Sequence, residues 1–411
     1  MSQIKDITLA PSGEKKIKWV ERNMPVLRGI GEDFKKEKPF SGLKIALSVH
    51  MEAKTAYLCR VLEMGGAEMY VTGSNPLSTQ DDVAAAVAAG GIEVFARYGC
   101  SMEEYEECLC RVLEIGPNII IDDGGDLVHL MHTKYTDLIP GVIGGCEETT
   151  TGIHRLRIMA RDGALRFPMV MVNEADCKHM FDNRYGTGQS VWDAMMRTTN
   201  LIVAGKTVVV SGYGWCGKGV SLRAKGMGAK VIVTETDPVR ALEAVMDGYE
   251  VMPMAEAAKR GDMFITVTGC SGIITAEHFE TMKDGAILSN AGHFDVEVDM
   301  AGLEKLAVEK YEARHNIQAY VLPNGKTLFT IAEGRLINLA AGDGHPAEIM
   351  DMSFAVQALS ARWLAQHRGQ LQPGVIPVPR ELDEAVARRK LKAMGVAIDS
   401  LSDEQISYLG L

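Results

Sequence analysis

The chain has 411 residues, of which 46% are hydrophobic and 24% are charged, so we expect a globular protein of about two or three domains. Its formal net charge of −11 argues against a nucleic-acid partner. No apolar run is long enough to cross a membrane, and the N-terminus lacks the charged-then-apolar order of a signal peptide, so we expect no membrane partner and a cytoplasmic location.

Apolar strands and amphipathic helices alternate through the first half of the chain. The predicted strands cover residues 44–49, 68–72, 92–96, 118–121, 141–144 and 168–172, and the predicted helices include 53–64, 79–89, 102–115 and 152–161. Alternation with short turns is typical of a parallel sheet covered on both faces. We therefore predict an α/β fold with a doubly wound parallel sheet in this half.

Clusters of ionisable side chains, with other polar residues among them, follow four of the six predicted strands. They are His50, Glu52 and Lys54; Asp122, Asp123 and Asp126; Glu147 and Glu148 with Thr149, Thr150 and Thr151; and Asn173, Glu174, Lys178, Asp182 and Asn183. Ligands bind beyond the carboxyl ends of parallel strands. Some of these residues are expected to be helix caps, namely Thr151 and one of the paired acids. The density of charge nevertheless favours a polar substrate pocket.

The eight cysteines are scattered along the chain and predict reduced thiols. Cys108 and Cys110 form a C-x-C pair inside a helical pattern, with no second pair near them in the sequence. Because a structural zinc site needs four ligands, the sequence predicts no metal site.

A β-branched run at 208–210 leads into Gly212-Tyr213-Gly214-Trp215-Cys216-Gly217, which has the G-x-G-x-x-G spacing. The first glycine permits a tight turn, the second lets the backbone approach a pyrophosphate, and the third lets the next helix pack on the strand. The pyrophosphate would lie on the N-terminus of that helix. The pattern predicts a dinucleotide site, although a glycine-rich turn that binds nothing is the alternative.

The next predicted strand, residues 230–234, ends in Glu235. A carboxylate at this position accepts hydrogen bonds from the ribose hydroxyls and repels a 2′-phosphate, which favours NAD over NADP. Two more predicted strands, 262–268 and 286–289, end in small or polar residues, as a cofactor crevice requires. The glycine-rich loop 340–346 is suited to a hinge or a cofactor wall, and a long helix is predicted at 348–367.

Several motifs resemble the adenosylhomocysteinase (S-adenosyl-L-homocysteine hydrolase) family. They are D-D-G-G-D-L at 122–127, E-E-T-T-T-G at 147–152, F-D-N-R-Y-G at 181–186, G-Y-G at 212–214, G-H-F-D at 292–295 and G-H-P at 344–346. The resemblance covers nearly the whole chain. It implies a substrate-binding domain at 1–185 and 346–379, a Rossmann NAD-binding domain at 186–345 and a helical C-terminal oligomerisation segment at 380–411, in a homotetramer with tightly bound NAD.

The resemblance also implies the reaction. A thioether nucleoside and water give a nucleoside and L-homocysteine, reversibly, through oxidation of the 3′ carbon, loss of the 4′ proton, departure of homocysteine from the 5′ carbon, addition of water and reduction of the ketone. By this match Lys178 and Asp182 hold the 3′ and 2′ hydroxyls, Glu148 also reaches the ribose, and Asn183 orients the lysine. His50 and Asp123 match the acid and base near the 5′ carbon.

The residue types fit this chemistry. Lys178 and Asp182 are spaced i,i+4, so on a helix they share one face and can reach one sugar edge. A lysine beside the positive nicotinamide is expected to have a lowered pKa, which favours its use as a base. An exposed i,i+4 ion pair is the alternative.

The same match implies a set of cofactor contacts. They are Thr149, Thr150, Thr151, Asn183, Gly212, Gly214, Trp215, Cys216, Gly217, Lys218, Gly219, Glu235, Arg240, Ala291, Gly292, His293, Asn338 and His345. His293 and His345 also reach the substrate by this match. Thr187 stands where many members carry a cysteine near the nicotinamide.

Two departures from the family pattern matter. Many members read the adenine edge with a threonine and a glutamate where this chain has Glu52 and Lys54. Lys54 could donate to O6 of hypoxanthine while Glu52 accepts from N1–H, which would make S-inosyl-L-homocysteine the substrate. Alternatively, Glu52 accepts from adenine N6 and Lys54 faces solvent or pairs with Glu52. Many members also continue past Leu411 with a tail that reaches the neighbouring subunit's NAD, so that contact is expected to be lacking here.

Two other functions are compatible with the two-domain plan. One is a D-2-hydroxyacid-type NAD dehydrogenase, which would consume NAD stoichiometrically. The other is an NAD-sensing protein that has lost catalysis. The presence of Lys178, Asp182, His50 and Asp123 argues against the second.

Overall fold

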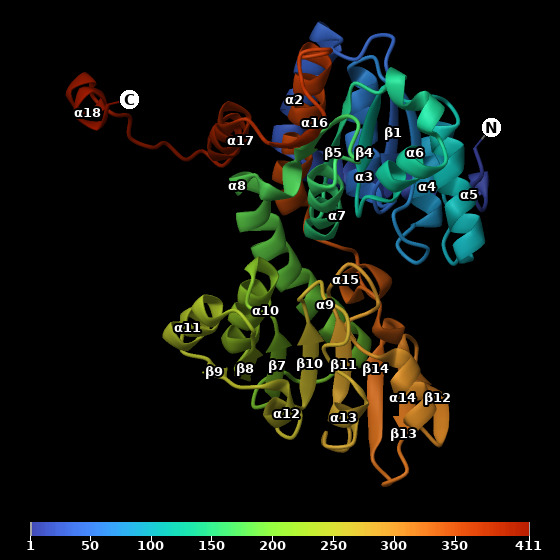
Figure 1. The fold of residues 1–411 in the computed structure, drawn as a ribbon, viewed down its shortest axis with the longest axis vertical. Helices are drawn as coiled ribbons and strands as arrows, with labels where there is room; N and C mark the ends of the chain where they lie inside the picture. Colours follow the sequence, from blue (N-terminus) through green and yellow to red (C-terminus); the bar gives the residue numbers. More distant parts are fainter. Residues whose placement is uncertain (1, 411) are drawn as a thin grey trace.

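The computed structural model describes residues 2–410 and contains two sheets, each in its own α/β layer arrangement (Figure 1). The first sheet has the strand order β15-β6-β5-β4-β1-β2-β3, and the second has the order β12-β13-β14-β11-β10-β7-β8-β9. The α/β class predicted from the sequence is confirmed.

All strands of the first sheet pair in parallel. They are β1 (Lys44–Ser48), β2 (Glu68–Thr72), β3 (Glu93–Phe95), β4 (Ile119–Asp122), β5 (Gly144–Glu147), β6 (Pro168–Met171) and β15 (Gly374–Pro377). The helices of this part are α1 (Ala10–Asn23), α2 (Pro25–Glu37), α3 (Ala53–Met64), α4 (Asp81–Ala89), α5 (Met102–Leu113), α6 (Asp126–Thr133), α7 (Thr150–Arg161) and α16 (Ala347–Gln366). Because helices cover both faces, the central strands β1 and β4 are buried and apolar except at their ends, where Lys44 is half-buried and Ser48 and Asp122 are polar.

One predicted strand is wrong by three residues. The expected strand at 141–144 is β5 at Gly144–Glu147, and Thr136–Gly141 forms a 3-10 helix instead. A Cβ at Gly145 would lie 2.6 Å from the Ile120 carbonyl oxygen, so this buried strand needs glycine despite the low strand propensity of that residue. Glu147 is therefore the last residue of the strand and is completely buried.

The second sheet is parallel except at one edge. Its parallel strands are β7 (Thr207–Ser211), β8 (Lys230–Thr234), β9 (Glu250–Val251), β10 (Met263–Thr266), β11 (Ile287–Asn290) and β14 (Thr327–Ile331). The antiparallel edge, β12 (Glu309–Arg314) and β13 (Ile317–Val321), was not predicted. Every residue of β12 is exposed and most are polar, so its sequence lacks an apolar face.

Helices flank the second sheet as well. They are α9 (Thr187–Thr199), α10 (Trp215–Gly226), α11 (Pro238–Met246), α12 (Met254–Ala257), α13 (Ala276–Phe279), α14 (Met300–Leu306) and α15 (Ile337–Ala340). Within residues 2–410 the 3-10 helices are Ile7–Leu9, Thr136–Gly141, Val172–Glu174 and Ala332–Gly334. Within residues 2–410, no helix is both long and apolar enough to span a membrane.

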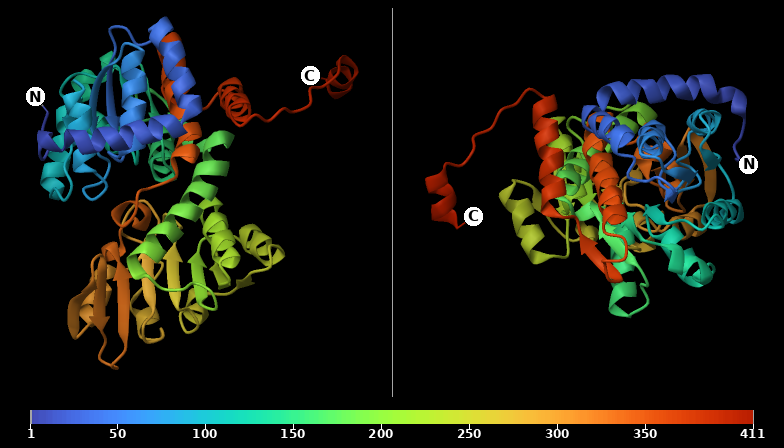
Figure 2. Two further views of the ribbon diagram at one scale, coloured as in Figure 1. Left: turned by 180° about the vertical axis from the view of Figure 1, so that it is seen from behind. Right: turned by 90° about the horizontal axis from the view of Figure 1, so that it is seen from above.

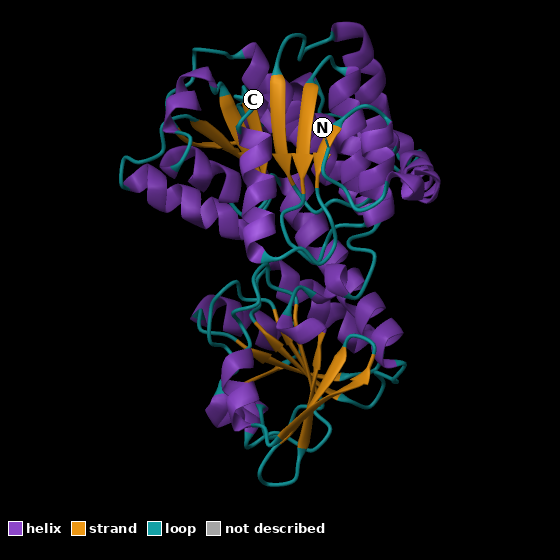
Figure 3. Cartoon of the chain, turned by 90° about the vertical axis from the view of Figure 1, so that its right-hand side faces the viewer, coloured by secondary structure: helices purple, strands orange, loops and turns teal. Residues whose placement is uncertain are grey.

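The carboxyl ends of the two sheets face each other. Figure 3 shows the strands of the first sheet pointing toward the second, and Figure 1 shows β7, β10 and β11 pointing back. The chain crosses between the sheets through α8 (Asp176–Lys178) and a π-helix (His179–Gly186) that leads into α9, and returns through the loop before α16. Both rows of strand-end residues therefore meet in one region.

The C-terminal segment leaves the body of the molecule. Helix α17 (Arg380–Ala393) packs against α16 and α2, with Val386 buried, whereas α18 (Asp403–Leu409) has no buried residue. Figure 2 shows α18 projecting away from both sheets.

Candidate active site

Lys178 lies at the centre of a buried polar cluster where α8 meets the first sheet. Its Nζ donates to Asn173 Oδ1 at 2.8 Å and Asn183 Oδ1 at 2.9 Å. It also lies 3.2 Å from Asp182 Oδ2 and 3.5 Å from Glu148 Oε1. Because the Lys178 side chain is only 6% exposed, the alternative of an exposed ion pair is wrong.

Burial and two neighbouring carboxylates act in opposite directions on the pKa of Lys178. Burial works to lower this pKa, but the Asp182 and Glu148 carboxylates outweigh burial and raise it above its usual value. The expected lowering depends on the charge of a bound nicotinamide and stays a prediction. The effect of the two carboxylates is to hold the ammonium in its charged form.

The two carboxylates beside Lys178 are themselves held by α16. Ser353 Oγ donates to Asp182 Oδ2 at 2.9 Å, and Gln357 Nε2 donates to Glu148 Oε2 at 2.6 Å. Ser353 and Gln357 are spaced i,i+4 and completely buried. The sequence interpretation missed them, and the available signal was polar residues on the core face of an apolar helix.

The two carboxylates differ in charge state. Burial works to raise the pKa of Asp182, but the charges of Lys178 and His345 hold it well below its usual value. Burial raises the pKa of Glu148 to about 7, against the opposing effect of Lys178. His345 binds Asp182 through Nδ1, and its Nε2 lies 3.3 Å from Thr187 Oγ1.

His50 and Asp123 form the second chemical group of the site. His50 Nε2 lies 3.3 Å from Asp123 Oδ2, and Ser74 Oγ donates to the same carboxylate oxygen at 2.7 Å. His50 Nδ1 lies 2.7 Å from Ser78 Oγ. The His293 ring reaches over from the second sheet to 5.9 Å from the His50 ring. The structure thus brings these three predicted residues together.

Burial lowers the pKa of His50 to about 4, although Asp123 opposes the shift. Burial works to raise the pKa of Asp123, but the charges of His50 and His293 and the Ser74 hydrogen bond hold it below its usual value. At neutral pH the pair is therefore a neutral imidazole beside a carboxylate. Such a pair can accept or return one proton.

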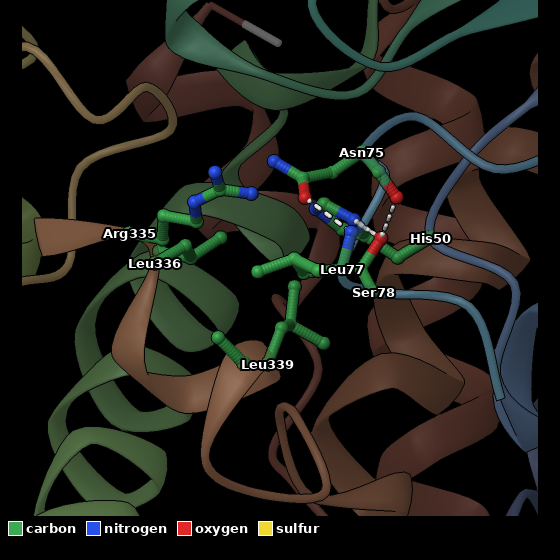
Figure 4. A pocket seen from close by; sticks show the side chains of 8 residues that line it. His50, Asn75, Leu77, Ser78, Arg335, Leu336 and Leu339 are labelled. Carbon is green, nitrogen blue, oxygen red and sulfur yellow. Dashed lines mark hydrogen bonds between the residues drawn. The ribbon is translucent and has the colours of Figure 1, made fainter. Parts of the chain in front are cut away.

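A small pocket opens beside His50 between the two sheets (Figure 4). One wall comes from the loop after β2 and the other from the segment around α15; the lining residues are His50, Asn75, Leu77, Ser78, Arg335, Leu336, Leu339 and Ala340. Arg335 Nε is buried without a hydrogen-bond partner among the described residues. The Arg335 guanidinium, whose Nε lies 3.9 Å from Asp295 Oδ2, therefore brings a positive charge to the wall of the pocket near His50.

Glu52 and Lys54 are buried at the start of α3. The Glu52 carboxylate caps this helix by accepting from Lys54 N at 3.0 Å and Thr55 N at 3.3 Å. Lys54 Nζ lies 2.8 Å from Glu52 Oε2 and donates to the Asp343 carbonyl oxygen at 2.9 Å. Because the Lys54 side chain is 8% exposed, a solvent-facing Lys54 is wrong, whereas pairing with Glu52 is confirmed.

The glycine turn has the shape that a dinucleotide requires. A Cβ on Gly217 would lie 1.9 Å from the Gly212 carbonyl oxygen, so only glycine fits there. Helix α10 begins after Gly214 without a side-chain cap, which leaves its first N–H groups for an anion. Asn338 Oδ1 is buried with no hydrogen-bond partner in the described chain. These residues fit NAD.

Glu235 sits at the carboxyl end of β8. Burial works to raise its pKa, but hydrogen bonds from the backbone N–H groups of Asp237, Tyr213 and Thr236 hold it below the usual value. The carboxylate is therefore charged and oriented toward the turn, as an acceptor for ribose hydroxyls must be.

The predicted threonine residues at 149–151 lie at the start of α7. Thr149 rather than Thr151 caps α7, because Thr149 Oγ1 accepts from Gly152 N at 3.0 Å; the prediction for Thr151 is wrong. Asn173, one of the strand-end residues that predicted the pocket, donates to Thr150 Oγ1 at 2.8 Å. Cys216 Sγ lies 3.6 Å from Thr187 Oγ1.

Other predicted cofactor residues lie on α10 and just after β11, at the carboxyl end of the second sheet. The Trp215 ring centroid lies 5.2 Å from that of His179, with the rings tilted at 34°, and Lys218 pairs with Glu243 at 2.6 Å. A Cβ on Gly219 would lie 1.7 Å from the Arg184 carbonyl oxygen, which shows how closely α10 meets the π-helix. Ala291 and Gly292 follow β11 directly, and all cysteines described are free.

Comparison with known proteins identifies the family. An adenosylhomocysteinase of Thermococcus kodakarensis is 58% identical over 406 residues, covering 99% of this chain and 96% of the relative. An S-inosyl-L-homocysteine hydrolase of Methanococcus maripaludis is also 58% identical, over 409 residues, covering 100% and 98%. The chain belongs to the S-adenosyl-L-homocysteine hydrolase family.

Family profiles agree with this assignment. The profile described as S-adenosyl-L-homocysteine hydrolase matches residues 1–137, and that of the S-adenosyl-L-homocysteine hydrolase NAD-binding domain matches residues 183–344. A dipicolinate synthase polypeptide of Bacillus halodurans shares the fold, with a TM-score of 0.50 and 14% identity over 80% of this chain and 99% of that one. The protein is thus an NAD-binding hydrolase that acts on a nucleoside thioether.

Proposed function

We propose that this hydrolase cleaves its thioether reversibly by transient 3′ oxidation, 4′ deprotonation and 5′ elimination. The observation that carries this proposal is the buried Lys178 ammonium, held by Asn173, Asn183 and two carboxylates next to the dinucleotide turn. The Gly212 turn and Glu235 would hold NAD, which when bound would supply the hydride acceptor for the 3′ carbon and the hydride for the final reduction. The same geometry makes a net-NAD-consuming dehydrogenase the second candidate.

The residues around Lys178 have separate roles in this proposal. Lys178 Nζ holds the 3′ oxygen and exchanges its proton. Asp182 is charged and is held by His345 and Ser353. It can therefore accept a hydrogen bond from the 2′ hydroxyl of the sugar. Glu148 Oε1 lies 3.5 Å from Lys178 Nζ and has no hydrogen-bond partner within residues 2–410. It can therefore accept a hydrogen bond from the other ribose hydroxyl. Fixed acceptors on both hydroxyls position the 3′ carbon for oxidation.

His50 and Asp123 act at the 5′ carbon. The pair passes the 4′ proton to the sulfur of homocysteine, which leaves as the thiol; as water then adds at the 5′ carbon, the pair takes a proton from the water and returns it to the 4′ carbon. Asp123 stabilises the imidazolium that forms between these steps, as a carboxylate 3.3 Å away can do. The pocket beside His50 would receive the homocysteine part, whose carboxylate would meet the Arg335 guanidinium alongside its present partner Asp295.

For the base we propose hypoxanthine, and hence S-inosyl-L-homocysteine. A lysine ammonium has three N–H donors, and Lys54 uses two of them on Glu52 and Asp343. The third needs an acceptor, which hypoxanthine O6 provides and the adenine 6-amino group does not. The adenine alternative, in which Glu52 accepts from N6, remains the competing form of the proposal. Relatives named for either substrate are equally similar, so overall identity does not separate them.

One experiment tests the reaction and the base together. The NAD-loaded enzyme is given each thioether, and free thiol and nicotinamide absorbance are followed. The proposal expects thiol release with no net change in nicotinamide absorbance and a kcat/KM ratio that favours the inosyl substrate by about tenfold or more. Stoichiometric NADH formation without thiol would favour a dehydrogenase, and neither signal would favour an NAD sensor. A ratio near one removes the base assignment only.

We further propose a homotetramer in which residues 380–411 contact a neighbouring protomer. Helix α18 contributes no buried residue to the described chain, and Tyr408 and Leu409 are 90% and 55% exposed. Light scattering on the full-length chain tests this directly. A monodisperse monomer at working concentration would refute it.

A further inference from the structure

Glu147 has no role in the mechanism above, yet it joins the two loops that carry its groups. Its Oε1 accepts three hydrogen bonds, from Gly124 N, Thr149 N and Thr149 Oγ1, each at 2.9 Å. Gly124 directly follows Asp123, and Thr149 directly follows Glu148. One carboxyl oxygen therefore fixes both the proposed acid–base loop and the ribose-binding loop.

The other oxygen of Glu147 is in the opposite situation. Oε2 is buried and makes no hydrogen bond in the part of the chain that the structure describes. A Cβ on Gly152 would lie 2.1 Å from the Glu147 carboxyl carbon, so α7 packs directly on this group. A buried anionic oxygen without a donor is unfavourable by several kcal/mol, whereas a neutral carboxylic acid avoids most of this penalty.

The charges around Glu147 also favour the neutral form. Asp122 is its register partner on β4, and Asp123 and Glu148 are next to the pair in the chain. From α6 comes Asp126, which is already paired with Arg155 of α7 at 2.7 Å. Burial, followed by the charge of Asp122, raises the pKa of Glu147 well above its usual value. Burial likewise raises the pKa of Asp122 to about 7.

We propose that Glu147 is a positioning residue for Asp123 that works in its protonated form, sharing one proton with Asp122, and that loss of this proton releases both loops at alkaline pH. The inference rests on the proposed role of Asp123. A carboxyl group with a raised pKa in the folded state contributes stability that is complete below its unfolded pKa. That stability is lost as the pH rises through the folded pKa.

The test compares the NAD-loaded wild-type enzyme with Glu147→Gln. The amide keeps a carbonyl oxygen for the three hydrogen bonds and cannot ionise. At about pH 7 we expect kcat/KM within about threefold of wild type, because the proposal has Glu147 protonated there and the amide keeps the same three hydrogen bonds. The alkaline midpoint of the kcat/KM profile should move up by about one pH unit or more, and Tm should fall less between about pH 7 and pH 10.

Asp351→Asn serves as the matched control. Asp351 is another buried carboxyl group that accepts from two backbone N–H groups, of Val26 and Leu27, but it lies among α2, α16 and α17. Its replacement should lower Tm and leave the alkaline midpoint of kcat/KM in place. Movement of the midpoint in this control would show that general destabilisation, rather than Glu147, sets the alkaline limit.

If Glu147→Gln fails to fold, Asp122→Asn tests the same pair, because it removes the ionisable group that shares the proton with Glu147. This variant is expected to have a lower kcat, since one backbone N–H loses a carboxylate acceptor, but its alkaline midpoint should still move up. Profiles and Tm curves that superimpose on wild type would overturn the proposal. If the wild-type enzyme releases no thiol, the proposed function fails, and the Tm comparison still tests Glu147 by itself.

Discussion

Replacing Lys54 by glutamine tests how the site reads the base. In the wild-type chain the ammonium is 2.8 Å from Glu52 Oε2 and 2.9 Å from the Asp343 carbonyl oxygen, and its third N–H is assigned to O6 of hypoxanthine. Glutamine is shorter and uncharged. Hydrogen bonds to charged groups contribute roughly 1.5–3 kcal/mol, so kcat/KM for the inosyl substrate should fall by about 10- to 150-fold.

The adenosyl substrate should lose much less, because its 6-amino group is a donor and makes no such bond with Lys54. The assay is thiol release with both substrates, expressed as a ratio of kcat/KM. Lys390→Gln is the control: Lys390 Nζ pairs with Asp351 at 3.0 Å in a buried setting away from the site. It should lower stability and leave the ratio unchanged. A Lys54→Gln enzyme with the wild-type ratio would show that Lys54 does not read the base.

Three further substitutions probe the other parts of the site. Lys178→Met should lower thiol release by about a thousandfold or more while NAD binding, read by tryptophan fluorescence, stays near wild type; loss of binding in parallel would point to a structural role. Glu235→Ser should reduce the preference for NAD over NADP by about 10- to 100-fold in reconstitution of the stripped protein, and an unchanged preference would remove the ribose assignment. Glu148→Gln should lose activity. Because burial raises the pKa of Glu148 from 4.5 to about 7, its stability contribution fades as the pH rises across that window. The variant should therefore gain about 1–3 kcal/mol relative to wild type above about pH 7, measured by denaturation, and a constant difference across pH would contradict this.

The parallel sheets were predictable because their strands are apolar on both faces and their helices amphipathic. The strand at 230–234 has the predicted bounds, and the Gly212 turn has the predicted geometry. The strand β5 was misplaced because its glycine residues are dictated by contacts with β4 and β6 rather than by local preference. The exposed strand β12 carries no apolar period that could identify it.

The site was predictable where its residues follow strands and less so where they come from elsewhere. Asp123 and Lys178 stand at strand ends or just beyond, so chain position alone suggests that they meet. Ser353 and Gln357 reach the site from the middle of a buried helix, and only the tertiary packing of α16 brings them to the carboxylates. The raised pKa of Lys178 depends on two carboxylates from different segments, which the sequence pattern could not rank against the cofactor charge.

The most direct test of the account is removal of the dinucleotide from the purified enzyme, followed by the thiol-release assay with and without added NAD. The account predicts that the stripped protein leaves the thioether intact and that NAD restores cleavage without accumulating as NADH. Cleavage by the stripped protein at the rate of the loaded enzyme would contradict the proposed oxidation of the sugar.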